Sequence, residues 1–255
     1  MLEIADLHVS FGRRRHALRA VDGVSLRVAP EETLAIVGES GSGKTTVARC
    51  VVGLQKPAAG TITFDGQPLG PAHRRTAGQR RAIQMVFQDP RSSLNPRMTV
   101  AGIVGEAWRT HPAAAPPGDR HTALRKVLAD VGLDADLLDR RPGDLSGGQC
   151  QRVSIARALA VGPRLLVCDE AVSALDVSVQ AQILRLLVDL RASHSLALLF
   201  ITHDLGVVHQ LADQVAVMCR GAVVEEGPTS EVLGNPRHDY TQALLDAALD
   251  LAVEA

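Results

Sequence analysis

Short apolar runs predict strands at intervals along the chain. Leu2–Phe11 and Val24–Val28 alternate apolar and polar residues, which is typical of strands with one buried face. Thr33–Val37, Leu165–Cys168 and Ala197–Ile201 are continuous apolar runs, as expected for strands buried on both faces of a parallel sheet. The chain therefore predicts a buried sheet assembled from segments far apart in sequence.

Helical spacing separates these strands. Lys44–Leu54 and Val179–Leu190 are compatible with helices, and apolar residues between Ser92 and Ala160 also recur at helical spacing. Thr110–Arg120, which is rich in Pro, Ala and Gly, predicts a loop within that region. The pattern also predicts a short strand at Thr61–Phe64 and a hairpin of Val215–Met218 and Ala222–Val224 around Gly221. From Thr229 it predicts a helical tail with a break at Pro236. The pattern predicts a parallel α/β core interrupted by a mostly helical insertion.

Composition narrows the function classes. The net charge of −1 over 255 residues gives no bulk attraction to nucleic acid, and an aromatic content of 2% argues against a base-stacking surface. The apolar stretches are far shorter than the ~20 residues of a membrane span, and the first residues lack the pattern of a signal peptide. Four scattered cysteines without a C-x-x-C pair argue against a zinc or iron–sulfur site and fit a reducing compartment.

A glycine-rich octapeptide follows the buried run Thr33–Val37. Its residues are Gly38, Glu39, Ser40, Gly41, Ser42, Gly43, Lys44 and Thr45. They match G-x-x-x-x-G-K-[ST], in which backbone N–H groups and a helix N-terminus receive phosphates. Lys44 is expected on the β- and γ-phosphates, Thr45 on Mg²⁺, and Thr46 within the same nucleotide-binding set. A glycine-rich turn is the alternative, but the preceding strand and following helix favour the phosphate site.

Two carboxylates end the second buried run. Asp169 and Glu170 follow Leu165–Cys168, and such residues face the ligand crevice when the strand is parallel. Asp169 is predicted to hold Mg²⁺ through water, and Glu170 to orient or deprotonate the attacking water. Acidic residues can also simply end a strand at solvent, but the phosphate-binding loop upstream favours the catalytic interpretation.

A second anion-binding pattern lies between these motifs. Its residues are Leu145, Ser146, Gly147, Gly148 and Gln149, which lead into a helical stretch. LSGGQ in this position resembles the ATP-binding-cassette superfamily over nearly the whole chain. The resemblance implies a P-loop NTPase (RecA-like) α/β core, an N-terminal antiparallel β subdomain and an inserted helical subdomain. It also implies that the signature receives the ATP of a neighbouring subunit.

Other positions match family motifs residue by residue. Gln88 resembles the Q-loop glutamine that senses Mg²⁺ and meets the membrane partner, and His203 resembles the switch histidine at the γ-phosphate. The resemblance implies that both are catalytic residues together with Glu170. Phe11 resembles the aromatic residue that stacks on adenine. The D-loop that crosses the dimer interface is matched by Ser173, Ala174, Leu175 and Asp176. The resemblance therefore implies ATP and Mg²⁺ as ligands, with Thr45, Gln88 and Asp169 at the metal.

The resemblance also implies a domain layout. Residues 1–255 form a single nucleotide-binding domain. Residues 1–91 and 162–228 make its catalytic core and β subdomain, residues 92–161 its helical subdomain with the signature, and residues 229–255 its tail.

Three stretches point to a subfamily. Gln88–Arg97, Cys168–Gln180 and His238–Leu245 resemble ATPases of oligopeptide, dipeptide and nickel importers. The chain has no cysteine after Cys219, so it resembles the cluster-free one of the two ATPases that such importers use. The implied partners are a paralogous ATPase subunit, two membrane permease subunits and, indirectly, an extracytoplasmic solute-binding protein. The implied location is peripheral, at the cytoplasmic face of the inner membrane.

Some residues depart from the family pattern. Cys150 stands where arginine is common, Asp239 replaces a frequent proline, and Arg141–Asp144 differs from the usual lead-in to the signature. Cys150 could alter the signature helix or make the site sensitive to thiol reagents. Two other functions stay open at this point: a soluble cassette ATPase without a transport role, and a phosphate-binding module without turnover. Lys44, Asp169, Glu170 and His203 together argue against the second.

Overall fold

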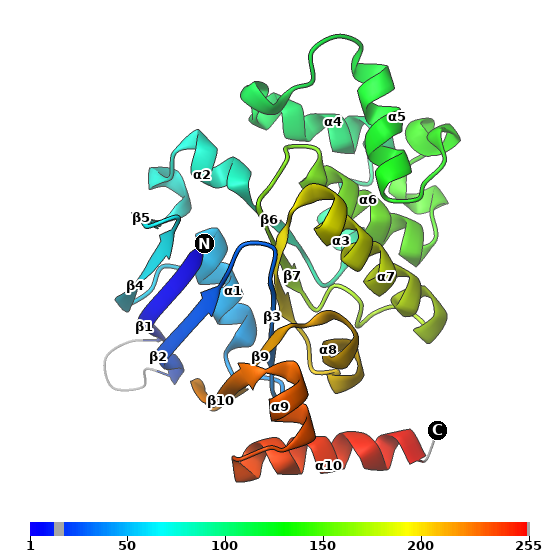
Figure 1. Cartoon of the computed structure of the whole chain (residues 1–255). Helices are drawn as coiled ribbons and strands as arrows, with labels where there is room; N and C mark the ends of the chain where they lie inside the picture. The colour runs from blue at the N-terminus through cyan, green and yellow to red at the C-terminus, as the bar shows by residue number, and fades with distance from the viewer. Residues whose placement is uncertain (13–17, 254–255) are drawn as a thin grey trace. The chain divides into compact units, whose positions relative to one another are not determined.

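The structure is a computed structural model that describes residues 1–12 and 18–253 (Figure 1). It divides into two compact units. The first unit comprises Met1–Arg75 and Ala197–Ala255, and the second unit comprises Thr76–Leu196. The domain boundaries expected after residues 91, 161 and 228 remain predictions.

The first unit contains an antiparallel sheet of order β2-β1-β4-β5. Its strands are β1 (Leu2–Phe11), β2 (Leu18–Val28), β4 (Ala59–Phe64) and β5 (Gln67–Pro68). Leu2 of β1 pairs with Val28 on one side and Phe64 on the other. The pattern predicted β1, but it placed the start of β2 at Val24, because Arg19 and Asp22 interrupt the apolar alternation. Pairing with β1 nevertheless extends β2 back to Leu18, which lies opposite Phe11.

A second sheet of the first unit has the order β10-β9-β3-β8. Its strands are β3 (Thr33–Val37), β8 (Ala197–Ile201), β9 (Gln214–Cys219) and β10 (Ala222–Pro228). β3 pairs in parallel with both β8 and β9, and all five of its residues are buried, as the continuous apolar run predicted. β9 and β10 form the predicted hairpin around Gly221. The predicted strands at residues 33–37 and 197–201 are confirmed.

The remaining elements of the first unit are helical. They are α1 (Lys44–Val52), the 3₁₀ turn η1 (Ala72–Arg74), α8 (Leu205–Leu211), α9 (Thr229–Gly234) and α10 (Asp239–Val253). The tail breaks between α9 and α10 at the segment that contains Pro236, as expected, because proline cannot continue a helix. α1 follows the loop after β3 (Figure 1) and stops at Gly53, whose φ of 81° ends the helix two residues before the predicted end.

The second unit pairs β6 (Ile83–Val86) in parallel with β7 (Leu165–Asp169), and its other elements are helical. These are α2 (Ala77–Ala82), α3 (Pro90–Ser93), α4 (Val100–Thr110), α5 (Arg120–Asp130), α6 (Gly147–Leu159) and α7 (Val177–His194), with 3₁₀ turns η2 (Pro112–Ala114), η3 (Ala135–Asp139) and η4 (Pro142–Asp144). The predicted helical character of the insertion is confirmed. The apolar pattern did not predict β6, because this strand has only four residues, one of them the polar Gln84, and its inner pair is half-buried.

α7 is longer at both ends than the predicted helix Val179–Leu190. Asp176 accepts a hydrogen bond from the Val179 N–H at its start, and Ser195 ends it in a left-handed conformation. Among residues 1–12 and 18–253, no helix is both long and apolar enough to cross a bilayer.

Arg75 fixes the end of α1 and thereby supports the element that begins at the phosphate-binding loop. Its buried guanidinium donates to the carbonyl oxygens of Val51 at 2.7 Å, Cys50 at 3.2 Å and Gly70 at 2.8 Å. The carbonyls at a helix C-terminus have no partner within the helix, so a buried cation there satisfies them. Burial lowers the pKa of Arg75, opposed by the nearby Cys50.

We predict that Arg75→Met lowers the free energy of unfolding by about 2–4 kcal/mol, because buried carbonyls lose charged donors. For a chain of this size, the melting temperature falls by about 5–10 °C. Differential scanning calorimetry measures the change. Arg74→Met, one position earlier and exposed, is the matched control and leaves the melting temperature unchanged. Equal melting temperatures for both variants would contradict this role of Arg75.

Candidate functional site

The loop between β3 and α1 curls tightly because three glycines adopt positive φ. Gly38, Gly41 and Gly43 have φ values of 143°, 82° and 105°, which side chains disfavour. Two of them also lie against neighbouring backbone. A Cβ on Gly38 would come 2.1 Å from the Met218 carbonyl oxygen, and one on Gly43 would come 2.2 Å from that of Ala20. The glycines are therefore required both for conformation and for close packing against β9 and β2.

Lys44 lies inside this loop. Its side chain is 4% exposed, and its ammonium donates to the carbonyl oxygens of Gly38 at 2.7 Å and Glu39 at 2.8 Å. The Ser42 hydroxyl oxygen is a third acceptor at 3.4 Å. The loop thus surrounds a buried cation at the N-terminus of a helix, where the helix dipole is also positive. This concentration of positive potential is what a phosphate group requires.

The other loop residues differ in exposure. Glu39, Ser40 and Gly41 are exposed, Ser42 is buried, and Thr45 and Thr46 are half-buried in the first turn of α1. The hairpin of β9 and β10 supports the loop from one side, because the Gly221 N–H donates to the Ser42 carbonyl oxygen at 3.0 Å.

His203 lies at the same edge of the sheet as the loop. β3 and β8 run in parallel with Ile36 opposite Ile201, and the Thr202 N–H donates to the Ile36 carbonyl oxygen at 3.2 Å. Continuing this register places His203 level with Gly38, where the loop begins. This register brings the predicted switch histidine next to the phosphate-binding loop, and the side chain of His203 is exposed there.

Phe11 is 43% exposed at the end of β1 and pairs with Leu18, which is 69% exposed. Two residues further along β2, Ala20 lies against Gly43 of the loop. The strand β2 therefore pairs with Phe11 at one position and contacts the phosphate-binding loop two residues later. The contact of the Phe11 ring with adenine stays a prediction.

In the second unit, the two predicted catalytic side chains Gln88 and Glu170 meet directly. Gln88 Nε2 donates to Glu170 Oε2 at 2.6 Å across 82 positions of sequence. The parallel register of β6 and β7, with Val86 opposite Cys168, explains the meeting, since it places the two residues at the same level beyond the strands. Glu170 adopts a φ of 48°, an unfavourable conformation for a side-chain-bearing residue that is frequent at functional sites. Asp169, immediately before it, is buried.

The signature segment forms a capped helix N-terminus. The Ser146 hydroxyl accepts from the Gln149 N–H at 3.2 Å, and the Gln149 side-chain oxygen accepts from the Ser146 N–H at 2.9 Å. This capping box fixes the start of α6, while Ser146 itself stays exposed. Leu145 is buried and anchors the segment. The predicted second anion-binding pattern thus lies at a helix N-terminus, as the sequence indicated.

The structure also brings the signature beside the D-loop. A Cβ on Gly148 would come 2.6 Å from Val179 Cγ1, and one on Gly147 would come 3.6 Å from Leu175 Cδ2. The D-loop residues Ser173, Ala174 and Asp176 are exposed next to them. Gly148 therefore permits the start of α7 to approach the signature helix closely, while the D-loop lies at ordinary van der Waals distance from Gly147.

Two arginines that the sequence did not single out connect the Q-loop to the signature. Arg91 Nη2 donates to the Leu145 carbonyl oxygen at 3.2 Å, and Arg157 Nη1 donates to that of Ser93 at 2.8 Å. The Asp89 carboxylate caps the short helix α3 by accepting from the N–H groups of Ser92 and Arg91. Hydrogen bonds from Ser92, and then from Arg91, hold the pKa of this carboxyl below the ordinary value. No sequence signal identified the contacts of the two guanidinium groups, because each joins residues more than 50 positions apart.

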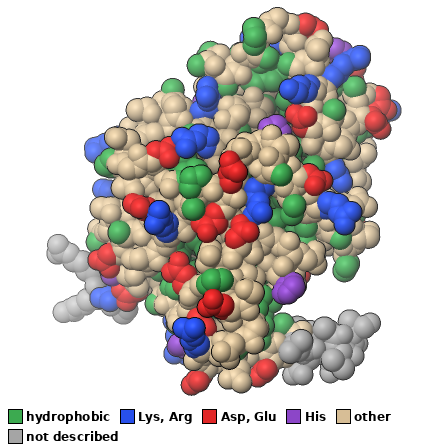
Figure 2. All heavy atoms as spheres, viewed as in Figure 1, with side chains coloured by type: hydrophobic (Ala, Val, Ile, Leu, Met, Phe, Trp, Pro, Cys, Tyr) green, Lys and Arg blue, Asp and Glu red, His purple; other side chains and the backbone are tan. Residues whose placement is uncertain are grey.

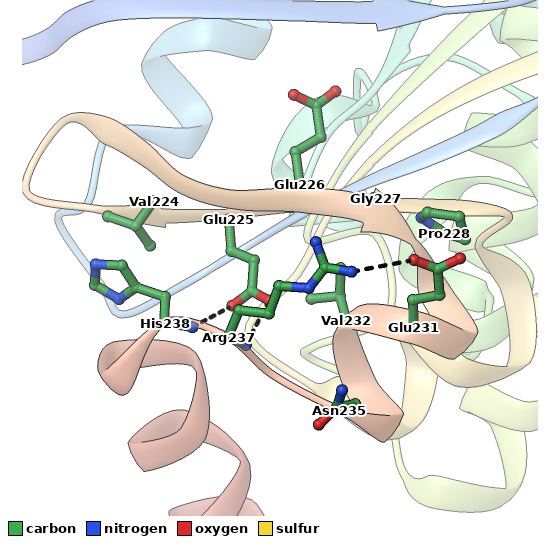
Figure 3. A pocket seen from close by; sticks show the side chains of 10 residues that line it. All are labelled: Val224, Glu225, Glu226, Gly227, Pro228, Glu231, Val232, Asn235, Arg237 and His238. Atoms are coloured by element: carbon green, nitrogen blue, oxygen red, sulfur yellow. Dashed lines mark hydrogen bonds and ion pairs between the residues drawn. The ribbon is translucent and has the colours of Figure 1, made fainter.

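Figure 2 shows acidic and basic side chains interspersed over the face in view. A cavity of about 380 Å³ lies beside β10 and α9, and its lining includes Glu225, Glu226, Glu231, Arg237 and His238 (Figure 3). None of these residues was predicted for the nucleotide site.

Comparisons with known proteins show which family this chain resembles. The family described as ABC transporter matches residues 21–173. The oligopeptide transport ATP-binding protein OppF of Salmonella typhimurium is 46% identical over 97% of this chain and 77% of its own length.

The chain belongs to the ABC transporter family.

Other relatives extend the agreement. AmiF of Streptococcus pneumoniae, an oligopeptide transport ATP-binding protein, is 45% identical over 97% of this chain and 81% of its own length. The dimeric cassette MJ0796, solved in a post-hydrolysis state with ADP and Pi, superposes with a TM-score of 0.78 and 26% identity over 90% of this chain and 99% of that one. CbiO1 of Clostridium perfringens, part of the complex cbiONQ, gives a TM-score of 0.81 and 27% identity over 100% and 98%. The predicted P-loop NTPase fold of an ABC ATPase is confirmed.

The position of Cys150 does not support the hypothesis that its thiol makes the signature sensitive to thiol reagents. Its side chain is fully buried, and its Sγ lies 3.5 Å from the Pro142 carbonyl oxygen of η4. Burial raises the pKa of its thiol, with Arg91 opposing and Asp89 adding to the shift. The unusual Arg141–Asp144 segment therefore packs on Cys150, and the thiol serves packing.

We predict that Cys219 is the thiol that reacts first with an aromatic disulfide reagent at pH 8. It is half-buried, whereas Cys50, Cys150 and Cys168 are buried. Burial also raises the pKa of Cys50 to about 11 and that of Cys168 to about 12. At pH 8 their thiolate fractions are therefore about 0.1% or less.

Two variants check this assignment by the rate of thiol release. Cys219→Ser abolishes the fast phase, and the matched control Cys150→Ser retains it. A fast phase that survives in Cys219→Ser and disappears in Cys150→Ser would show that the signature thiol is accessible.

Proposed function

We propose that this chain is the ATP-binding and ATP-hydrolysing subunit of an importer for peptides or a related small solute such as nickel, and that it works by ATP-driven closure of a cassette dimer. The observation that carries hydrolysis is the hydrogen bond between Gln88 and Glu170, which joins a Q-loop amide to a carboxylate at the end of a parallel strand. The likeness to OppF and AmiF over 97% of the chain supports the solute class.

The first unit would bind the nucleotide. Lys44 and the loop from Gly38 to Thr46 would hold the phosphates, because this segment combines a cation with backbone donors at a helix N-terminus. His203, level with Gly38, would contact the γ-phosphate. The exposed ring of Phe11 would stack on adenine.

The second unit would supply hydrolysis and the contact with a neighbouring subunit. Glu170 would orient the attacking water and receive its proton, and Gln88 would position the Glu170 carboxylate. Ser146–Gln149 would receive the γ-phosphate of the partner's ATP at the N-terminus of α6. Ser173–Asp176, beside the signature, would cross the same interface. Phosphoryl transfer in such a site depends on positioning and electrostatics.

Mg²⁺ fits the donors that this chain provides. Thr45 offers a hydroxyl, Asp169 a buried carboxylate and Gln88 an amide oxygen, and Mg²⁺ prefers oxygen ligands. When bound, the ion would neutralise charge on the phosphates. Asp169 would hold it through water, at the end of β7.

The proposed partners are a second, paralogous ATPase subunit and two permease subunits, with an extracytoplasmic solute-binding protein acting indirectly. The chain would lie peripherally at the cytoplasmic face of the inner membrane. Among relatives, OppF and AmiF are named as oligopeptide transport ATP-binding proteins, and cbiO1 as part of the complex cbiONQ. Co-purification of this chain with permease subunits from membranes tests the assembly.

We predict that Glu170→Gln keeps ATP binding but lowers turnover by about 10²–10⁴-fold, because the side chain can no longer accept a proton. The glutamine oxygen can still accept the hydrogen bond from Gln88, so the local geometry is retained. Radioactive phosphate release in the assembled complex measures turnover, and equilibrium dialysis measures ATP binding.

Asp189→Asn, which also neutralises an exposed carboxylate of the second unit, is the matched control and retains turnover. Wild-type turnover in Glu170→Gln would remove Glu170 from the proposed role.

We predict that the isolated chain hydrolyses ATP slowly, with a specific rate that falls on dilution and rises when the partner ATPase is added. The reason is that the proposed site needs the signature of a second subunit. Initial rates at several protein concentrations, with sedimentation velocity to report the oligomeric state, make the comparison. A constant specific rate in samples that sediment as monomers would contradict the shared site.

A further inference from the structure

The C-terminal helix α10 touches the phosphate-binding loop. The N–H of Glu39 donates to the Tyr240 hydroxyl oxygen at 3.1 Å, although the two residues lie 201 positions apart. Tyr240 belongs to the His238–Leu245 stretch, to which the proposed mechanism gives no role. This contact therefore joins an unassigned sequence motif to the loop that would hold the phosphates.

The peptide group at this contact is held from both sides. The peptide between Gly38 and Glu39 directs its N–H to Tyr240 and its carbonyl oxygen, that of Gly38, to the Lys44 ammonium at 2.7 Å. The φ of Gly38, 143°, belongs to the range that glycine enters without strain, so glycine by itself leaves this peptide free to rotate. A rotation would break both hydrogen bonds at once. The Tyr240 hydroxyl thus restrains the carbonyl that holds Lys44.

Packing fixes the tyrosine ring. Tyr240, Leu244, Leu245 and Ala248 of α10 pack against a buried cluster that includes Ala35 and Val37 of β3. β3 leads directly into the loop, so Tyr240 packs against a cluster that includes the strand before the loop and contacts the loop through its hydroxyl. Burial raises the pKa of Tyr240, with the Glu39 and Cys219 side chains adding to the shift and the Glu39 N–H opposing it. The phenol therefore stays protonated and neutral at physiological pH.

The start of α10 is fixed to the same hairpin that supports the loop. The Glu225 carboxylate of β10 accepts from the N–H groups of Arg237 at 2.8 Å and His238 at 3.1 Å, as the dashed lines in Figure 3 show. His238 Nδ1 accepts from the Tyr240 N–H at 3.1 Å. The position of Tyr240 is thus set by hydrogen bonds at its N–H and at its hydroxyl oxygen, in addition to its packing.

We propose that Tyr240 is a positioning residue for nucleotide binding, whose hydroxyl fixes the Gly38–Glu39 peptide and through it the place of the Lys44 ammonium. The inference rests on the proposed role of Lys44 at the phosphates. It assigns to the C-terminal tail a share in the affinity for ATP, transmitted through a single hydrogen bond. The tyrosine itself touches no phosphate.

The test compares ATP affinity in Tyr240→Phe, which keeps the ring and removes the hydroxyl, with that of wild type. We expect the dissociation constant of the full chain for MgATP to rise about three- to tenfold, the value of one hydrogen bond. Displacement of a fluorescent ATP analogue measures the affinity, and calorimetry confirms that the melting temperature changes little. Gln242→Ala, at an exposed position on α10, is the matched control and binds ATP as wild type does.

A double-mutant cycle with Lys44→Ala separates positioning from general stability. Because Tyr240 acts through Lys44, the effect of Tyr240→Phe shrinks to less than about twofold in the Lys44→Ala background. An effect of equal size in both backgrounds, or wild-type affinity of Tyr240→Phe, would overturn the inference while leaving the proposed function intact.

A different result identifies failure of the proposed function. If Lys44→Ala itself binds ATP as tightly as wild type, the phosphate-binding role of the loop falls, and the inference about Tyr240 falls with it. Tyr240→Leu, which removes both ring and hydroxyl, is the variant that reports on packing. A lowered melting temperature in Tyr240→Leu, combined with normal ATP affinity in Tyr240→Phe, would show that the tail contributes stability only.

Discussion

The close wrapping of backbone around the Lys44 ammonium is the constraint on which the rest of the first unit depends. The cation is buried and needs acceptors, and the carbonyl oxygens of Gly38 and Glu39 supply them within the loop itself. Backbone can approach so closely only where side chains are missing, which is why β2 and β9 press their carbonyl oxygens against Gly43 and Gly38. The parallel strand β3, the helix α1 and the hairpin of β9 and β10 all serve to hold this curve.

The second unit brings together motif residues that lie far apart in the sequence. Parallel pairing of β6 with β7 places Gln88 against Glu170. Side-chain caps then fix the helix starts, with Ser146 on α6 and Asp176 on α7. Gly148 of the signature lies against Val179 of α7, and Gly147 lies beside Leu175 of the D-loop. The signature and the D-loop therefore lie side by side within the second unit.

Residues outside the phosphate-binding loop and the signature also hydrogen-bond to the backbone near these motifs. Arg75 holds the far end of α1, and Tyr240 holds the near end of the loop. In the second unit, Arg91 connects the Q-loop to the start of the signature. All three act on backbone carbonyl or N–H groups, which every residue carries. They therefore contact the backbone of the loop, of α1 and of the signature, and not the side chains predicted to be catalytic.

The sequence by itself determined the strands at residues 33–37 and 197–201, the phosphate-binding loop, the helix N-terminus at the signature and the family, because each is encoded in adjacent residues. The spacing of apolar residues also predicted the helical insertion, and Pro236 predicted the break in the tail. Only the tertiary structure decided the meeting of Gln88 with Glu170, the existence of β6, the burial of Cys150 and the contact of Tyr240 with the loop. These depend on strand register and on packing between segments up to 201 positions apart. Hydrophobic periodicity reports which face of an element is buried, but it carries no information about which distant segment covers that face.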